Sequence, residues 1–420
     1  MKIIHVNASD LSGSGIAAMR LNHALTVAGV DSSLLVSRKT RGDALTVPLL
    51  GFAEKTARAR VSGVYWAMRS LGLYQDGLRS LNVLPTGLHK RLNASDADII
   101  HLHWVNSEMI SISELAKIKK PVVWTLHDMW PFCGAEHYTT RTRYVTGYSK
   151  VGRGKLNVEC EENSTDNQQL TTNNRRPLVD LDRWVFHRKQ KHWTGWIPHI
   201  VTPSNWLANC ARQSVLFKDL SVDVIPNCLD LDVFEAMDQK VARKRFDLPL
   251  DKKLILFGAF NPSDERKGGD LLEEALKHIE CDGVELIVFG ASAGADIAGI
   301  KTHWVGSLSQ EADLAQLYSA VDLFVASSRQ DNLPNTVAES ISCGAPVVAF
   351  NIGGIPDMVE HKHNGYLAQP FDVEDLARGV EWVLSGASRG DNARKKAEEL
   401  FDETRVASAY LKVYQNLVSA

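Results

Sequence analysis

Two carboxylates eight residues apart carry the clearest chemical signal in this chain. Asp331 lies in a loop after an apolar run, VDLFVASS, and Glu339 lies on the helix that Pro334 can begin. Backbone N–H groups at the start of such a helix attract phosphate. A carboxylate on the first turns can accept hydrogen bonds from sugar hydroxyls. The pattern favours a site for a sugar attached to a diphosphate, and an ordinary strand–loop–helix turn with surface acids is the alternative.

A basic pair, Arg266 and Lys267, follows another predicted strand, KLILFGAF. Transfer of a sugar from a diphosphate needs positive charge at the leaving group, because negative charge builds up there as the bond breaks. The pair is a candidate for this role, although adjacent basic pairs are often simply solvated. No Asp-x-Asp motif lies in a suitable loop, so the sequence predicts no metal and no cofactor.

Histidines stand at the ends of two predicted strands. One strand, WTLHD, ends in His127 and Asp128, and another, HLHW, contains His101 and His103. Because α/β enzymes place ligands at the carboxyl edge of their sheets, these side chains are candidates for ligand contact. A hydrogen-bonded structural histidine is the alternative, and it weighs more for the HLHW pair than for His127.

Small residues follow the first predicted strand. Gly13 and Gly15 would let the backbone approach a ligand at a helix start. Residues 13–18 also match GxGxxA, a dinucleotide fingerprint that would indicate a dehydrogenase. That match is weak, because five residues separate the strand from the turn and the second strand ends in Arg38 and Lys39 instead of an acid.

The segment from Val321 to Phe350 resembles the acidic–x7–acidic motif of retaining glycosyltransferases with a GT-B fold, family 4, also called glycosyl transferases group 1. The family motif usually begins with Glu, so Asp331 departs from it. A second departure is Ala259, where the family usually has an arginine. The Gly-rich turn at residues 353–354 is expected to pack near the donor.

This resemblance implies roles for individual residues. The first acid would touch a hexose hydroxyl, the amides that follow would hold the diphosphate, and the second acid would hold the ribose. It implies catalytic roles for His127, Asp331 and Lys267. It implies donor binding by Glu339, Asn332, Leu333, Pro334, Asn335, Thr336, Arg266, Gly13 and Gly15, and acceptor-side roles for Asp128 and His103.

Strands alternate with helical stretches along the whole chain, which predicts parallel sheets with helices on both faces. The pattern restarts at Val222, so we expect two Rossmann-like, doubly wound α/β domains facing a cleft. The predicted domains are an acceptor-binding domain at 1–205 and a nucleotide-sugar-binding domain at 206–399. By resemblance, a last helix at 400–420 packs back on the first domain.

Composition is that of a soluble globular protein: 44% of the 420 residues are hydrophobic and 23% are charged. No run approaches 18 apolar residues, and the first residues lack a cleavage-site pattern, so neither a membrane span nor a signal peptide is expected. Six cysteines without a C-x2-C pair argue against a metal or disulfide framework. We therefore expect a cytoplasmic protein.

Charge is unevenly distributed between the halves. Residues 1–200 hold 26 Lys and Arg against 17 Asp and Glu, whereas the remainder holds 21 against 33. A basic first half is compatible with an anionic partner, such as a diphosphate-linked acceptor or the inner face of a membrane. The mixed apolar and basic stretch at 64–85 could lie on such a surface, although packing on the core is the alternative. The polar stretch at 139–178 interrupts the strand–helix alternation.

The sequence thus predicts a retaining hexosyltransferase in surface polysaccharide biosynthesis. Its donor would be a nucleotide diphosphate sugar and its acceptor a saccharide or lipid-linked oligosaccharide, with no nucleic-acid partner. A sugar-nucleotide epimerase of the same fold would share the cleft but need no acceptor. A non-catalytic nucleotide-sugar-binding protein is the other alternative, to which the departures at Asp331 and Ala259 give some support.

Overall fold

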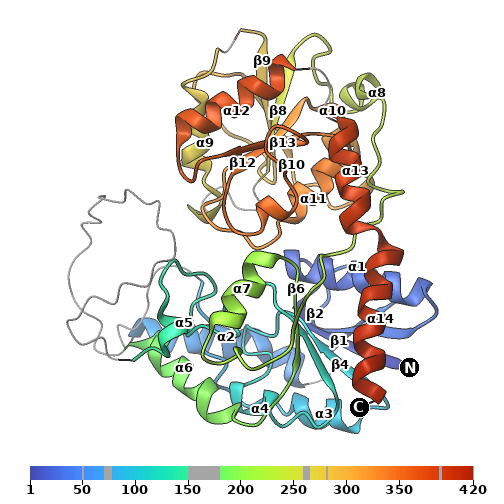
Figure 1. Cartoon of the computed structure of the whole chain (residues 1–420), viewed down its shortest axis with the longest axis vertical. Helices are drawn as coiled ribbons and strands as arrows, with labels where there is room; N and C mark the ends of the chain where they lie inside the picture. The colour runs from blue at the N-terminus through green and yellow to red at the C-terminus, as the bar shows by residue number, and fades with distance from the viewer. Residues whose placement is uncertain are drawn as a thin grey trace.

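Two Rossmann-like domains, each a parallel sheet covered by helices, make up the chain (Figure 1). The computed structural model describes residues 1–49, 52–70, 78–149, 180–258, 265–280, 282–386 and 390–419, with the backbone alone at 52–58. Ala259, and residues 150–178 of the polar stretch, lie outside the described residues.

The first sheet has seven strands in the order β3-β2-β1-β4-β5-β6-β7, all parallel. Its central strands β4 and β5 are buried along their whole length, as expected for strands covered on both faces. The strands are β1 (Lys2–Ser9), β2 (Asp31–Arg38), β3 (Thr46–Pro48), β4 (Ile99–Leu102), β5 (Val122–Thr125), β6 (His199–Thr202) and β7 (Val222–Val224).

Short polar side chains cap several helices of this domain. The hydroxyl of Ser12 accepts a hydrogen bond from the Gly15 N–H, and that of Ser204 accepts one from the Leu207 N–H. Such caps satisfy N–H groups that have no partner within the helix. The helices are α1 (Gly13–Val27), α2 (Phe52–Ser70), α3 (Leu88–Ala94), α4 (Ile112–Leu115), α5 (Arg143–Thr146), α6 (Leu181–His192) and α7 (Asn205–Gln213).

The strand at Val222 belongs to the first sheet. It pairs with β6, with Ile200 opposite Val222. The prediction that this strand opens the second set is therefore wrong, and the first sheet extends past residue 205. The sequence of a short strand can predict that it is a strand. Which neighbouring strand it pairs with depends on the tertiary structure.

The second sheet has six parallel strands in the order β10-β9-β8-β11-β12-β13. They are β8 (Lys253–Gly258), β9 (Val284–Phe289), β10 (Thr302–Gly306), β11 (Leu323–Ala326), β12 (Val347–Phe350) and β13 (Gly365–Ala368). The helical elements are α8 (Gln239–Arg245), η1 (Glu265–Lys267), α9 (Gly269–Leu276), α10 (Glu311–Ala320), α11 (Asn335–Ser342), η2 (Ile355–Asp357), α12 (Val373–Ser385) and α13 (Gly390–Phe401).

The chain returns to the first domain at its end (Figure 1). Helix α13 packs beside α11 in the second domain, whereas α14 (Glu403–Ser419) packs beside α1 in the first. Tyr410 and Tyr414 of α14 are buried in one cluster with Ile3 and Leu21. Among the described helices, none has the length and apolar character needed to cross a membrane.

Candidate functional site

The predicted site residues lie where the two sheets turn their carboxyl edges toward each other. In each sheet the strand order reverses beside the first strand, between β1 and β4 and between β8 and β11. Parallel α/β sheets bind ligands at such reversals. The loop between β11 and α11 is hydrogen-bonded to residues just after β5 and β6, and the first turn of α11 is hydrogen-bonded to the start of α1. The topology therefore places both halves of the predicted site at one domain boundary.

Asp331 lies with the two predicted cations. Its Oδ2 accepts from Lys267 Nζ at 2.6 Å and from Arg266 Nη1 at 3.1 Å. The carboxylate is buried, which alone would raise its pKa, but the charges and hydrogen bonds of Lys267 and Arg266 outweigh burial and lower the pKa. Asp331 is therefore a charged acceptor beside two cations, which is the local chemistry expected around a sugar diphosphate.

Glu339 makes an ion pair across the domain boundary. Its Oε1 accepts from Arg20 Nη2 on α1 at 2.8 Å, and its Oε2 accepts from the hydroxyl of Tyr318 on α10 at 3.1 Å. Burial raises the pKa of Glu339, and the nearby Arg20 works against that rise. Arg20 also reaches Glu311 at 2.9 Å. The predicted ribose-binding acid is thus held by the other domain.

Arg20 is a site residue that the sequence analysis missed. It is 7% exposed. It follows Ala17 by three residues and precedes Ala24 by four, so it occupies a core-facing position of α1. A charged residue at such a position needs a buried partner. That mismatch between charge and helical face is the signal that could have identified it.

Asn332 joins the loop between β11 and α11 to the first domain. Its Oδ1 accepts from Ser204 Oγ at 2.6 Å, and its Nδ2 donates to the carbonyl of His127 at 3.3 Å. Its backbone N–H is bonded to Asp331 Oδ1 at 3.0 Å. The side chain of Asn332 therefore acts as a contact between domains, and its predicted donor-binding role stays a prediction.

Asn335, at the first turn of α11, also makes contacts outside the second sheet's domain. Its Nδ2 donates to the carbonyl of Gly13 at 3.1 Å, and its Oδ1 accepts from Asn227 Nδ2 at 3.2 Å. Leu333 is buried in the apolar core of the second domain, and Pro334 is the residue that precedes α11. Thr336 is partly buried on the first turn of α11.

Glycines around the loop allow close backbone approach. A Cβ at Gly353 would lie 1.9 Å from the Asp331 carbonyl oxygen, and one at Gly354 would lie 1.8 Å from that of Asn332. The turn at residues 353–354 therefore packs directly on the loop that contains Asp331. Gly15 is equally constrained, with its added Cβ 2.1 Å from the Ser9 oxygen, whereas Gly13 has room beside Asn335.

His127 lies at the boundary on the first-domain side. It is partly exposed, its Nε2 lies 3.0 Å from His103 Nδ1, and burial lowers its pKa to about 4. A cavity of about 10 Å³ is lined by His127, Ala17 and Asn227 among others. His127 is thus a neutral imidazole beside the contact between the domains.

Both residues predicted on the acceptor side are buried. His103 is 3% exposed and lies behind His127. The Asp128 carboxylate accepts from Trp104 Nε1 at 2.7 Å and His137 Nδ1 at 2.6 Å. Burial opposes ionisation of Asp128, but these bonds and the His137 charge lower its pKa. Both side chains therefore make internal hydrogen bonds, and their acceptor-side roles stay a prediction.

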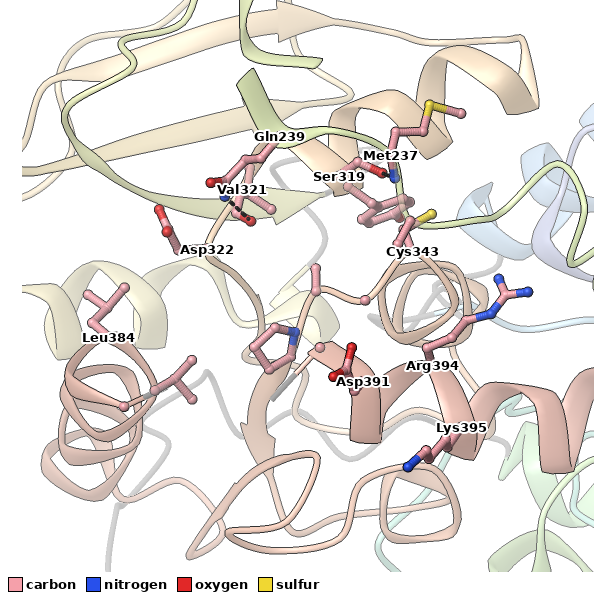
Figure 2. A pocket seen from close by; sticks show the side chains of 18 of the residues that line it. Met237, Gln239, Ser319, Val321, Asp322, Cys343, Leu384, Asp391, Arg394 and Lys395 are labelled. Carbon is pink, nitrogen blue, oxygen red and sulfur yellow. Dashed lines mark hydrogen bonds between the residues drawn. The ribbon is translucent and has the colours of Figure 1, made fainter. Parts of the chain in front are cut away.

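A cavity of about 680 Å³ lies elsewhere, on the second domain between α8, α10 and α13 (Figure 2). Arg394 lines it, but the guanidinium is occupied by the carbonyls of Leu231, Phe234 and Ser342. Residues 331–339 are not among those that line this cavity. Tyr318, which is hydrogen-bonded to Glu339, does line it. This cavity is therefore separate from the site at Asp331 and Glu339.

Two family models match this chain. The model described as Glycosyltransferase Family 4 matches residues 11–233, and the model described as Glycosyl transferases group 1 matches residues 251–386. A D-inositol 3-phosphate glycosyltransferase of Mycobacterium tuberculosis is 30% identical over 177 residues. That match covers 39% of this chain and 36% of the relative, so the chain spans little more than a third of the curated relative's length.

Solved structures of low sequence identity share the fold over nearly the whole chain. Sucrose-phosphate synthase from Thermosynechococcus elongatus matches with a TM-score of 0.66 at 18% identity and covers all of both chains. Anabaena HepE in complex with UDP-glucose has a TM-score of 0.63 at 16% identity, over 99% of this chain and 100% of that one. WaaG, a glycosyltransferase involved in lipopolysaccharide biosynthesis, has a TM-score of 0.59 at 14% identity, over 98% of this chain and 99% of that one. The predicted GT-B architecture of two Rossmann-like domains is confirmed.

Proposed function

Because the chain belongs to glycosyltransferase family 4, we propose that it transfers a hexose from a nucleotide diphosphate sugar to a saccharide or lipid-linked acceptor, with retention of the anomeric configuration. The observation that carries this proposal is the cluster at the start of α11, where Lys267 and Arg266 pair with Asp331. Two cations against one carboxylate attract a diphosphate, and the start of α11 adds to that attraction.

Donor binding is compatible with the ion pair between the domains. A carboxylate offers about four lone-pair sites on its two oxygens. In Glu339, Arg20 and Tyr318 occupy one site each. Ribose hydroxyls can therefore bond to Glu339 while Arg20 holds it. In this proposal the ion pair orients the carboxylate before the donor arrives, and no cofactor or metal is needed.

The acceptor would bind to the first domain, because that half of the chain carries the excess of basic residues. Trp66 on α2 is 72% exposed and Trp184 on α6 is 41% exposed, and basic residues accompany both on their helices. Exposed tryptophan beside positive charge suits an anionic membrane surface. We propose peripheral contact there, on the cytoplasmic side, during assembly of a surface polysaccharide. Nothing in the charge distribution calls for a nucleic-acid partner.

The test begins with the donor. Thermal-shift measurements with UDP-, GDP- and ADP-sugars should show stabilisation by one nucleotide class, and UDP-glucose is the first candidate because HepE binds it. Release of nucleotide diphosphate should then require a saccharide or lipid-linked acceptor. Proton NMR of the product should show the donor's anomeric configuration. Release without acceptor, together with an altered sugar, would instead support the epimerase, and binding without turnover would support a binding protein.

A further inference from the structure

Three histidines from neighbouring strands form a hydrogen-bonded chain that ends at His127. His5 lies on β1, and its Nδ1 is 3.0 Å from His103 Nε2. His103 follows β4, and its Nδ1 is 3.0 Å from His127 Nε2. Strands β1, β4 and β5 are adjacent in the sheet, so the chain runs across its carboxyl edge toward the domain boundary.

All three imidazoles are neutral near pH 7. Burial lowers the pKa of His5 to about 3 and that of His127 to about 4, and it holds the pKa of His103 well below 6.5. A neutral imidazole has one N–H and one bare nitrogen. Each hydrogen bond in the chain needs one donor and one acceptor, so the three protons must all lie on Nδ1 or all lie on Nε2.

The inner end of the chain decides between these two arrangements. His5 Nε2 is buried and has no partner among the described residues. With the protons on Nε2, His5 would bury an unpartnered N–H donor. With the protons on Nδ1, it buries a bare nitrogen. Orphaned buried N–H donors are rarer in proteins than unsatisfied acceptors. The Nδ1 arrangement is therefore favoured along the whole chain.

The same arrangement fixes the outer end. His127 Nε2 becomes an acceptor for His103, and the single N–H of His127 lies on Nδ1. Within the described part of the chain, this Nδ1 has no hydrogen-bond partner, and His127 lines the small cavity beside the Asn227–Asn335 contact. His127 thus has one N–H that is not used by its own domain.

We propose that His5 and His103 are positioning residues that hold His127 as its Nδ1–H tautomer, so that His127 presents a hydrogen-bond donor to a hydroxyl of the transferred sugar. The sugar contact rests on the proposed function, whereas the tautomer does not. Without His103, the protein would lose the interaction that selects this tautomer, and His127 could also present a bare nitrogen to the ligand.

His101 lies against the chain without belonging to it. Its ring stacks on His103 at a centroid distance of 4.3 Å. Its Nδ1 is bonded to the Tyr414 hydroxyl at 2.7 Å and its Nε2 to the Thr125 hydroxyl at 2.8 Å. His5, His101 and His103 lie close enough to hold a metal ion, but these hydrogen bonds already account for five of their six nitrogens. His101 is therefore the matched control for the chain.

The first experiment measures the tautomer itself. Long-range 15N–1H correlation NMR of the full-length protein, labelled at the histidine ring nitrogens, should show His127 protonated on Nδ1, with the signal assigned by its loss in His127→Gln. His103→Phe should shift His127 toward a tautomer mixture. His101→Phe, which replaces another fully buried imidazole, should leave His127 on Nδ1. A wild-type His127 protonated on Nε2 would overturn the proposal.

The second experiment measures the consequence for turnover. His103→Phe should lower kcat by about tenfold, the effect of one misplaced hydrogen bond, with KM for the donor little changed. His103→Asn should restore much of kcat, because its amide can donate to His127 from the place of Nδ1. His101→Phe should lose less than His103→Phe. Equal losses in both phenylalanine variants, with no recovery in His103→Asn, would mean that His103 is merely structural.

The two experiments separate two kinds of failure. If no nucleotide sugar is turned over, the proposed function fails, and the NMR measurement still decides the tautomer. If turnover is found but His127 carries its proton on Nε2, the proposed function stands and the positioning role is wrong.

Discussion

At the scale of single residues, the ion pair between Arg20 and Glu339 joins the two domains beside the candidate site. Both side chains are at most 7% exposed, and their nearest atoms lie 2.8 Å apart. Taking two charges out of water costs several kcal/mol each, so a buried pair persists only with good geometry and further hydrogen bonds. Tyr318 and Glu311 supply those bonds here. Glu339 is consequently an oriented acceptor, held by Arg20 and Tyr318.

Replacing this acceptor should weaken nucleotide binding. We expect Glu339→Gln to lower the affinity for the nucleotide diphosphate by about tenfold or more, because it removes charge-assisted bonds to ribose worth roughly 1.5–3 kcal/mol. Isothermal titration calorimetry would measure the loss. Glu311→Gln is the control, since it removes the other carboxylate on Arg20 and leaves Glu339 intact. Equal affinity in wild type and a folded Glu339→Gln would remove Glu339 from the donor site.

The charge on the leaving diphosphate should come from Lys267 and not from a metal. We expect turnover to continue in EDTA and to fall by about 10²-fold in Lys267→Met, the range for one positioned charge-stabilising group. Lys253→Met is the control, because Lys253 is paired with Asp322 on another face of the domain. Activity that EDTA abolishes and Mg²⁺ or Mn²⁺ restores would contradict this prediction.

At the scale of elements, the turn before η2 supports the loop before α11. Gly353 has φ +55° and lies against the Asp331 backbone, so a side chain there would meet the loop that holds the two cations. The turn and the loop come from different strand ends, and they can pack only because both glycines lack a Cβ. The position of Asp331 thus depends on a second segment about twenty residues further along the chain.

This dependence can be measured with a matched pair of glycines. Gly353→Ala and Gly299→Ala both place alanine at positive φ, but Gly299 has nothing within 4 Å of its added Cβ. Both should pay the left-handed strain of roughly 1–2 kcal/mol. Only Gly353→Ala should add an overpacking cost of about 1–3 kcal/mol and weaken nucleotide binding. Urea unfolding and calorimetry would test this, and identical behaviour of the two variants would contradict it.

At the scale of the whole molecule, buried histidines link the sheet of the first domain to the end of the chain. His101 is bonded to Tyr414 of α14, and Thr125 is bonded both to His101 and to Tyr410. Helix α14 therefore covers the polar cluster of the first domain. The histidines stay neutral in this enclosure, whereas in an unfolded chain they would bind protons below about pH 6.5.

Stability should therefore fall steeply as pH drops from about 6.5 toward 4. In that window the unfolded state binds more protons than the folded state, because the pKa of His5 is lowered to about 3, that of His127 to about 4, and those of His101 and His103 well below 6.5. Each histidine contributes about 1.4 kcal/mol per pH unit. Glu136 works in the opposite direction, since burial raises its pKa to about 7.

Urea unfolding measured from pH 7.5 to 4.5 would show this slope. His101→Phe should reduce the slope by about one histidine's contribution, roughly 1.4 kcal/mol per pH unit, even if it lowers stability overall. An unchanged slope in His101→Phe would mean that His101 is not held neutral in the folded protein.

The sequence by itself determined the fold class and the loop that contains Asp331. Alternating strands and helices predicted two Rossmann-like domains, and the spacing of Asp331, Pro334 and Glu339 marked the start of α11, which the structure confirms. These features are local, since a strand, a turn and a helix start depend on neighbouring residues. The pairing of Lys267 with Asp331 is a contact between two such local features in one domain.

Only the tertiary structure decided what lies opposite that loop. Arg20 meets Glu339 from 319 positions away, and Asn332 binds the backbone of His127 across the boundary. It also assigned Val222 to the first sheet and buried Asp128 and His103. These outcomes depend on how two finished domains pack and which polar groups then lose water. Such contacts leave no periodic pattern in the chain, so their partners become visible only when the domains are together.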